Sequence, residues 1–311
     1  MASSLLETHV RPDGLRGGLQ EVLAAYRSRA TRGGKAAVPP LTRIPSLVHG
    51  AVTGEYAPAL PLCGMALLAY LGIGLLDHLM DGDRNNFWQG ASPAETVLVA
   101  TTLGSALPIS VLARLDADPV AVVQIEQLYG NALLRMSAGQ REDILSVRNY
   151  TLDPGAVERS VAGKSGAFTG MLAEIAAVLA GAPPDAVEAY GDWGRGYGTA
   201  DQLRSDLGDL FVDSAGSDLR SGSVTYPLAC LMEATPEADR PATVERIATA
   251  HRDPEALKAL REELHSGGSI NSTAMTIRWH IEAARAALAR VESNQQFRDS
   301  LTTMVTRLLP G

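Results

Sequence analysis

The sequence predicts an all-α fold, and three observations lead to this prediction. Alanine and leucine dominate the chain, runs of β-branched residues are short, and glycines and prolines separate stretches with helical periodicity. We find no internal repeat, low-complexity tract or linker, so we expect one α-helical domain over residues 1–311. The expected helices span residues 13–31, 41–52, 57–81, 92–115, 118–147, 154–181, 184–213, 223–234, 238–250, 254–267, 269–292 and 295–308.

Composition narrows the class of protein. The 311 residues are 46% hydrophobic and 20% charged, which is typical of a packed chain and not of a disordered one. A net charge of −8 argues against a nucleic-acid partner. Cys63 and Cys230 are too few for a disulfide framework, and the N-terminal residues have no apolar signal segment. We therefore expect a cytoplasmic protein.

The segment 57–76 is apolar for about twenty residues, which is the length of a membrane span. However, it contains Pro58 and Pro61, lacks basic flanks, and leads directly into Asp77 and Asp81. These features favour a central helix that is apolar around its whole circumference, with no membrane span. Its acidic end is then expected to open into a cavity.

Asp77 and Asp81 lie four residues apart at the end of this helix. Both carboxylates project from one face, about 6 Å apart along the axis, and repel each other unless a cation lies between them. Oxygen ligands suit Mg²⁺. The alternative is a solvated helix C-terminus, where the helix dipole disfavours acidic residues.

A second acidic face occurs in the segment 196–213. Residues 201, 205, 209 and 213 form one helical ridge, and Gln202 and Asp206 form the neighbouring ridge with Asp209. By itself such a helix is often only solvated. Two acidic faces about 125 residues apart favour a shared metal site. The ridge that carries the acids consists of Asp201, Ser205, Asp209 and Asp213.

Taken together and in this order, these motifs resemble those of the trans-polyprenyl diphosphate synthases and, more broadly, the class I isoprenoid synthases. The resemblance covers about residues 30–290. It rests on Gly33-Gly34-Lys35, DHLMD at 77–81, Gly139-Gln140 with Asp143, Lys164-Ser165, QLRSDLGD at 202–209, and the segment 217–228.

The resemblance implies a single-domain isoprenoid synthase bundle, in which the two acidic motifs face each other across a central cavity. Two or three Mg²⁺ ions would then hold a prenyl diphosphate and help its C–O bond to ionise. By analogy, we expect a homodimer. The implied catalytic residues are Asp77, Asp81, Asp206 and Asp209; the metal ligands Asp77, Asp81, Asp201, Ser205 and Asp209; the diphosphate-binding residues Lys164, Gln202, Arg204 and Lys35; and the pocket residues Tyr70, Ile73, Gln140 and Phe168.

The sequence also departs from the family pattern. His78 replaces the second aspartate of the first motif, and Ser205 replaces the leading aspartate of the second. The acceptor side is less well preserved, because Arg84 stands where the family has two arginines and Ser223 where it has a lysine. A second diphosphate would find few partners here, which disfavours ordinary chain elongation.

These departures leave three functions open. The first is a class I terpene synthase that cyclises or rearranges the cation, since Asp201, Ser205 and Asp209 have the spacing of the terpene cyclase metal triad. The second is a prenyltransferase that joins the cation to an unusual acceptor or to isopentenyl diphosphate. The third is a non-catalytic subunit of a heteromeric synthase. Gly72 and Ile73 block the pocket little, so we expect a C15 or C20 substrate.

Overall fold

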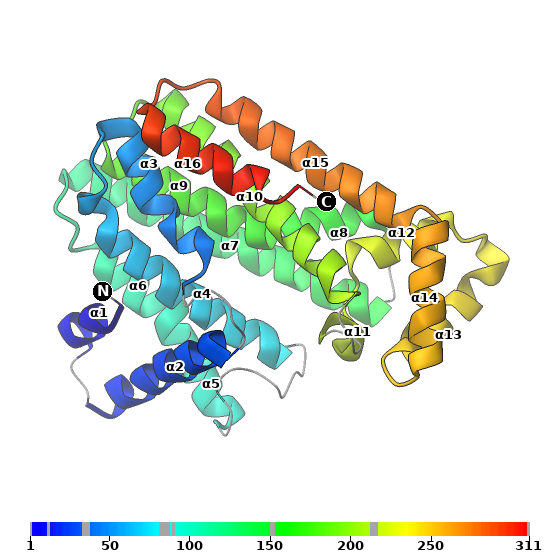
Figure 1. Cartoon of the computed structure of the whole chain (residues 1–311). Helices are drawn as coiled ribbons and strands as arrows, with labels where there is room; N and C mark the ends of the chain where they lie inside the picture. The colour runs from blue at the N-terminus through cyan, green and yellow to red at the C-terminus, as the bar shows by residue number, and fades with distance from the viewer. Residues whose placement is uncertain are drawn as a thin grey trace. The chain divides into compact units, whose positions relative to one another are not determined.

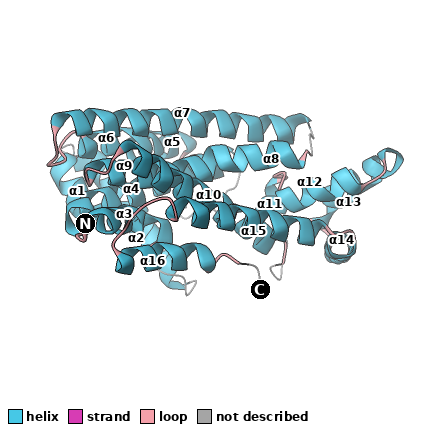
Figure 2. Cartoon of the chain, turned by 90° about the horizontal axis from the view of Figure 1, so that it is seen from above, coloured by secondary structure: helices cyan, strands magenta, loops and turns pink. Residues whose placement is uncertain are grey.

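The computed structural model describes residues 2–10, 13–32, 38–80, 88, 91–149, 153–211 and 217–309. This part of the chain consists of helices and loops and contains no strand, which confirms the predicted all-α class (Figure 2). The helices are α1 (Ala2–His9), α2 (Asp13–Arg32), η1 (Pro40–Arg43), α3 (Ile44–Thr53), η2 (Ala57–Ala59), α4 (Leu60–Met80), α5 (Pro93–Thr101), η3 (Thr102–Ala106), α6 (Leu107–Leu112), α7 (Pro119–Asn149), α8 (Pro154–Val161), η4 (Ala162–Gly166), α9 (Ala167–Leu179), α10 (Pro184–Asp209), α11 (Ser217–Ser221), α12 (Tyr226–Ala234), η5 (Glu237–Asp239), α13 (Arg240–Ala250), α14 (Pro254–Ser266), α15 (Ser269–Leu288) and α16 (Gln295–Thr306).

Most of the predicted helices are confirmed within a few residues, and the differences have local causes. Two helices contain a π-helical segment, η3 and η4, where one extra residue is accommodated in a turn. The helix expected over 184–213 ends at Asp209. The sequence analysis missed α1 and α11, which are short. Short helices have little periodicity to detect, and packing decides whether they form.

The chain divides into two compact units, each built from separate stretches of sequence. Unit 1 comprises residues 1–129, 172–187 and 292–301, and unit 2 comprises residues 130–171, 188–291 and 302–311. The boundary falls within α7, α9, α10 and α16, so neither unit is a contiguous segment that could be cut out of the sequence. The expectation of one domain stays a prediction.

The core of unit 1 surrounds α4. Leu68, Leu71 and Leu75 of this helix are fully buried, together with Leu6 of α1 and Leu103 of η3. Two stretches, Ala57–Met80 and Pro93–Leu112, are long and apolar enough to cross a membrane by length and composition. They pack against each other within unit 1 (Figure 1), which is the behaviour expected of core helices.

A glycine contact sets the distance between α4 and η3. A Cβ atom added at Gly72 would lie 2.6 Å from the Gly104 nitrogen and 2.7 Å from the Ala100 carbonyl oxygen. Only glycine allows the backbones to approach so closely. The Tyr129 hydroxyl donates a hydrogen bond of 2.7 Å to the Gly104 carbonyl. Leu103 and Gly104, in the middle of this π-helical segment, are therefore buried in the core.

Unit 2 has its own apolar cluster. Leu210, Leu219, Leu257, Leu260 and Leu264 are among its buried members, and they join α11 and α14 to the end of α10. Helix α12 packs against α8, α14 and α15, while α13 and α14 lie side by side (Figure 1). This cluster supports the acidic end of α10 described next.

Candidate active site

The second acidic motif lies at the C-terminal end of α10, in unit 2. Two other segments of unit 2 contribute residues around it. Asp143 and Gln140 come from α7, and Lys164 comes from the π-helical segment η4. Unit 2 thus contains most of the predicted site residues, namely Gln140, Lys164, Phe168, Asp201, Gln202, Arg204, Ser205, Asp206 and Asp209.

Glycines bring η4 against α7. A Cβ atom at Gly139 would lie 3.0 Å from the Ser160 carbonyl oxygen and 3.1 Å from the Gly163 carbonyl carbon. The Ser160 hydroxyl donates a hydrogen bond of 3.0 Å to the Gly139 carbonyl, which fixes the register. As a result, the Lys164 ammonium forms an ion pair with the Asp143 carboxylate. Both side chains are only 24% exposed, so this pair is partly shielded from solvent.

Glycines also bring η4 and α9 against α10. A Cβ atom at Gly194 would lie 2.6 Å from the Thr169 carbonyl oxygen, and one at Gly198 would overlap the Ser165 carbonyl and the Thr169 hydroxyl. The Thr169 hydroxyl donates a hydrogen bond of 2.7 Å to the Gly194 carbonyl. The helices are therefore held at backbone contact one turn before the acidic residues begin.

This contact produces a chain of hydrogen bonds that leads to a buried acid. The Ser165 hydroxyl donates to the Gln202 Oε1 atom at 3.1 Å, and the Gln202 Nε2 atom donates to the Asp206 Oδ1 atom at 2.7 Å. Asp206 is only 7% exposed. Burial raises its pKa to about 7, the Gln202 hydrogen bond and the Lys164 charge oppose this, and Asp143 adds to it.

The remaining acids of α10 lie closer to solvent. The backbone N–H of Asp218 donates a hydrogen bond of 3.0 Å to the Asp209 Oδ2 atom. Burial also raises the pKa of Asp201, while Arg204 opposes this shift. Arg204 and Ser205 are exposed, so the structure gives them no part in the buried hydrogen-bond chain. The Gln202 and Asp206 ridge, and not the Asp201 and Ser205 ridge, forms that chain.

Gln140 provides a polar group that lacks a partner. Its Nε2 atom is buried and makes no hydrogen bond to the described part of the chain. Gln140 precedes Asp143 by three residues on α7, so the two side chains share one face of the helix. A buried amide donor without an acceptor is costly, and an anionic ligand would satisfy it. Phe168, the other expected pocket residue of unit 2, is buried.

Unit 1 contains the first acidic motif. Asp77 is half-buried in the last turn of α4, and Tyr70 and Ile73 lie one to two turns before it. Gly72 packs against η3, so its small size serves the contact between helices as well as any pocket. Asp81, Lys35, Asp213 and Arg84 lie outside the described residues.

The donors are suited to Mg²⁺ in kind, although they do not form a complete cage. Within residues 2–309, gaps excluded, no group of three His, Cys, Asp or Glu side chains is placed to hold a metal ion. Mg²⁺ in enzymes is commonly held by one or two carboxylates, with substrate phosphates and water completing the octahedron. Within unit 2, Asp206 and Asp209 would supply such carboxylates. The metal site stays a prediction.

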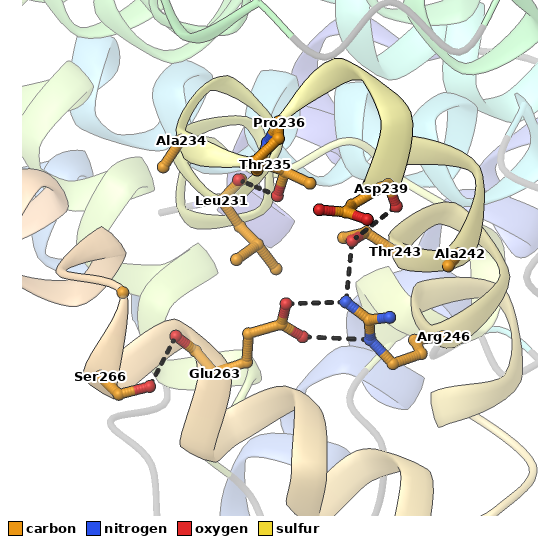
Figure 3. A pocket seen from close by; sticks show the side chains of 11 residues that line it. Leu231, Ala234, Thr235, Pro236, Asp239, Ala242, Thr243, Arg246, Glu263 and Ser266 are labelled. Atoms are coloured by element: carbon orange, nitrogen blue, oxygen red, sulfur yellow. Dashed lines mark hydrogen bonds and ion pairs between the residues drawn. The ribbon is translucent and has the colours of Figure 1, made fainter.

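A separate pocket of about 430 Å³ lies elsewhere in unit 2, between α12, α13 and α14 (Figure 3). Arg246 and Glu263 form a bidentate ion pair on its wall, with N–O distances of 3.1 and 2.7 Å. The Arg246 Nη2 atom also donates to the Thr243 hydroxyl at 2.8 Å. None of the predicted site residues lines this pocket.

The sequence analysis did not include two members of the polar cluster among the site residues. Asp143 and Ser165 both belong to motifs that were identified in the sequence, but neither was assigned a role. Both residues could have been found from the sequence. Asp143 follows Gly139-Gln140 and Ser165 follows Gly163-Lys164, and Gln140 and Lys164 were assigned to the site. The Asp218 contribution is a backbone N–H group, which no sequence pattern marks.

Comparisons with known proteins test the family that the sequence motifs indicated. Residues 91–264 match the Polyprenyl synthetase family. The geranylfarnesyl diphosphate synthase of Aeropyrum pernix is 26% identical over 297 residues, covering 91% of this chain and 89% of that protein. The geranylgeranyl diphosphate synthase of Mycobacterium tuberculosis is 26% identical over 228 residues, covering 69% and 63%.

Solved structures show the same fold. The geranylgeranyl pyrophosphate synthetase from Pyrococcus horikoshii has a TM-score of 0.83 at 19% identity, covering 100% of this chain and 95% of that one. The polyprenyl synthetase from Streptomyces coelicolor has a TM-score of 0.81 at 20% identity, covering 99% and 95%. The expected fold is thereby confirmed.

Proposed function

Because the chain belongs to the polyprenyl synthetase family, we propose that it is a trans-prenyltransferase, which ionises an allylic prenyl diphosphate and joins the prenyl group to an acceptor. One structural observation carries the proposal. Glycine contacts hold η4 against α7 and α10, and Lys164 lies near enough to Asp206 for its charge to lower the pKa of that acid. This arrangement provides cationic and amide donors for phosphate next to carboxylates for a metal ion.

The relatives change the order of the functions expected from sequence. Both curated relatives are named as prenyl diphosphate synthases, which favours prenyl transfer over the cyclisation that the altered motifs suggested. The expected terpene synthase becomes the second candidate. Arg84 and Ser223 differ from the family pattern on the acceptor side, so both a non-standard acceptor and isopentenyl diphosphate stay open, and isopentenyl diphosphate is the first one to test.

In the proposal, Lys164 exchanges its partner during the reaction. In this structure its ammonium neutralises Asp143. A diphosphate would compete for the ammonium as a stronger anion, and the released Asp143 carboxylate would then face the metal ion. Gln140 would donate its unpartnered Nε2–H groups to a phosphate oxygen. A lysine in this role acts as a point charge on the leaving group.

The carboxylates of the two acidic motifs would hold Mg²⁺, which neutralises the departing pyrophosphate when bound. Asp209 is oriented by the Asp218 N–H group, and Asp206 by Gln202. At pH 7 Asp206 is divided between its neutral and ionised forms, because its pKa is about 7. A cation beside it would favour the ionised form.

The experiment that tests the function uses the purified full-length chain with Mg²⁺. C10, C15 and C20 prenyl diphosphates are supplied one at a time, with and without isopentenyl diphosphate, and the products are separated by chromatography. Longer prenyl diphosphates that form only with isopentenyl diphosphate are the expected result. A hydrocarbon or alcohol formed from one substrate alone would establish the terpene synthase instead.

The third function, a non-catalytic subunit, makes a distinct prediction for the same assay. The retained Asp77 and Lys164 argue against it. An Asp77→Ala variant should lose product formation if the chain is the enzyme. If the folded, unaltered chain forms no product from any of the substrates, that result would favour the subunit.

We also propose that the protein is a homodimer. Unit 1 exposes large apolar side chains on α5, α6 and the start of α7, where Leu98 is 60%, Ile109 50%, Val120 76% and Val123 53% exposed. Apolar side chains so exposed are typical of a surface that a partner covers. Sedimentation velocity should give twice the mass of 32.8 kDa, and a Leu98→Glu variant should shift the chain towards monomer.

A further inference from the structure

Helix α14 holds the last residues of α10 directly. The Arg261 Nε atom donates a hydrogen bond of 2.6 Å to the Leu210 carbonyl oxygen. Leu210 follows Asp209, the last helical residue of α10. The carbonyls in the last turn of a helix lack partners within the helix, so an arginine from another element satisfies one of them here.

The apolar packing around Arg261 also joins α14 to the end of α10. Leu257, Leu260 and Leu264, on the same helix, belong to one buried cluster with Leu210 and Leu219. Leu219 follows Asp218, whose backbone N–H binds the Asp209 carboxylate. Helix α14 therefore supports both groups that define the position of Asp209: the end of its own helix and the N–H group that binds it.

The positive charge of Arg261 has a second effect on the end of α10. The C-terminal end of α10 carries the partial negative charge of the helix dipole together with the Asp206 and Asp209 carboxylates. A guanidinium at this carbonyl opposes the partial negative charge of the helix end. Arg261 is half-buried, so its charge is less screened than that of a fully exposed side chain.

We propose that Arg261 is a positioning residue for the second acidic motif, which holds Asp209 in the orientation needed to bind Mg²⁺ together with a diphosphate. The inference rests on the proposed function, since it assigns Asp209 to the metal. Arg261 acts through the Leu210 backbone and does not touch the substrate. Groups that orient metal-binding carboxylates in this way strongly affect metal affinity.

The chain offers a matched control, Arg246. This residue lies on α13 and pairs with Glu263, so it ties the same helix α14 to α13 instead of to the end of α10 (Figure 3). The test variants are Arg261→Met, which keeps the apolar stem and removes the donor, Arg261→Lys, which restores a cationic donor, and Arg246→Met.

The first measurement needs no catalysis. The melting temperature of each variant is followed as Mg²⁺ is added at a fixed concentration of inorganic pyrophosphate. Arg261→Met should raise the Mg²⁺ concentration for half-maximal stabilisation about tenfold. Arg261→Lys should recover part of this loss, and Arg246→Met should match the unaltered chain. In the prenyl transfer assay, the Mg²⁺ requirement should rise in parallel.

Two failures can be told apart. If the unaltered chain gains no stability from Mg²⁺ and pyrophosphate, the proposed function is wrong. If it does gain stability, but Arg261→Met and Arg246→Met behave alike, Arg261 is merely structural and this inference is overturned. Should Arg261→Met fail to fold, Arg261→Lys decides: a raised Mg²⁺ requirement supports the role, and an unchanged one refutes it.

Discussion

The two π-helical segments, η3 and η4, are both packed through close glycine contacts, but these contacts position different kinds of side chain. In unit 1, Gly72 packs against Gly104 of η3, and the Tyr129 hydroxyl seals the Gly104 carbonyl. In unit 2, η4 is packed through glycines on two sides, yet it projects Lys164 and Ser165 towards Asp143 and Gln202. The first segment is closed by an uncharged contact, and the second ends in charged and polar side chains.

The difference shows what glycine contacts can provide. Close backbone approach fixes the positions of neighbouring side chains to within the tolerance of the packing. In unit 1 the neighbours are apolar, Ala100 and Leu103 among them, so the gain is stability alone. In unit 2 the neighbours are ionisable, so the same rigidity places groups for chemistry. Single π-helical turns are frequent at functional sites for this reason.

The strongest test of the comparison removes the charge that η4 carries. Lys164→Ala should lower kcat/KM by about 10²–10³, because a preorganised charge on the leaving group is lost. The circular dichroism spectrum should not change. Lys258 is exposed on α14, and Lys258→Ala serves as the control that keeps full activity. Equal activities of the two variants would remove Lys164 from the site.

Widening the helix contact at Gly198 in unit 2 should lower both the catalytic rate and the stability. Gly198→Ala adds a Cβ atom that overlaps the Ser165 carbonyl and the Thr169 hydroxyl, so the helices must separate. We expect a loss of about a hundredfold in kcat/KM from the misplaced groups, and a decrease in the free energy of unfolding of about 1–3 kcal/mol. Steady-state kinetics and urea unfolding measure the two effects. A purely structural contact would change only the second.

Removing the hydrogen bond to the π-helical segment of unit 1 should affect stability alone. Tyr129→Phe leaves the buried Gly104 carbonyl without this donor, which should lower the free energy of unfolding by about 1–3 kcal/mol. The kcat of the folded variant should stay at the value of the unaltered chain. A large fall in kcat without loss of stability would show that η3 also serves catalysis, and the contrast between the segments would fail.

The buried acid of unit 2 should give the chain a distinct pH dependence. The pKa of Asp206 rises from 3.8 to about 7 on folding, so between these values the folded state holds a proton that the unfolded state has released. Stability from this group is therefore present at low pH and is lost as the pH rises towards 7.

Asp206→Asn should remove that dependence. Urea unfolding in EDTA at pH 5, 6, 7 and 8 would compare the variant with the unaltered chain. The difference in the free energy of unfolding should change by about 2 kcal/mol over this range, in favour of the variant at high pH. A difference that is constant with pH would mean that Asp206 is ionised throughout.

Much of the fold could be predicted from the sequence because long helices carry strong signals. The helices α4, α7, α14 and α16 lie within a few residues of their predicted ranges, since their apolar periodicity or uniform hydrophobicity extends over several turns. The π-helical segments could not be predicted. η3 packs against Gly72, and η4 packs against Gly139 and Gly198. These glycines lie far away in sequence, and no local pattern requires the extra residue.

The site residues also divide into those that the sequence could predict and those that it could not. Lys164, Gln202 and Asp206 were predicted as residues of one site, and the structure brings them together within unit 2. The sequence could not show that Asp206 is buried while Ser205 is exposed, because the two adjacent residues differ only in the side of α10 on which they lie. It also gave no sign of Arg261, whose role depends on the packing of α14.

The central proposal is that each acidic motif is needed for the binding of Mg²⁺ and a diphosphate. Isothermal titration of inorganic pyrophosphate into the full-length chain, with and without Mg²⁺, tests it most directly in the Asp77→Asn and Asp209→Asn variants. The account predicts Mg²⁺-dependent binding to the unaltered chain and its loss in each variant. Binding that survives either substitution at full affinity would contradict it.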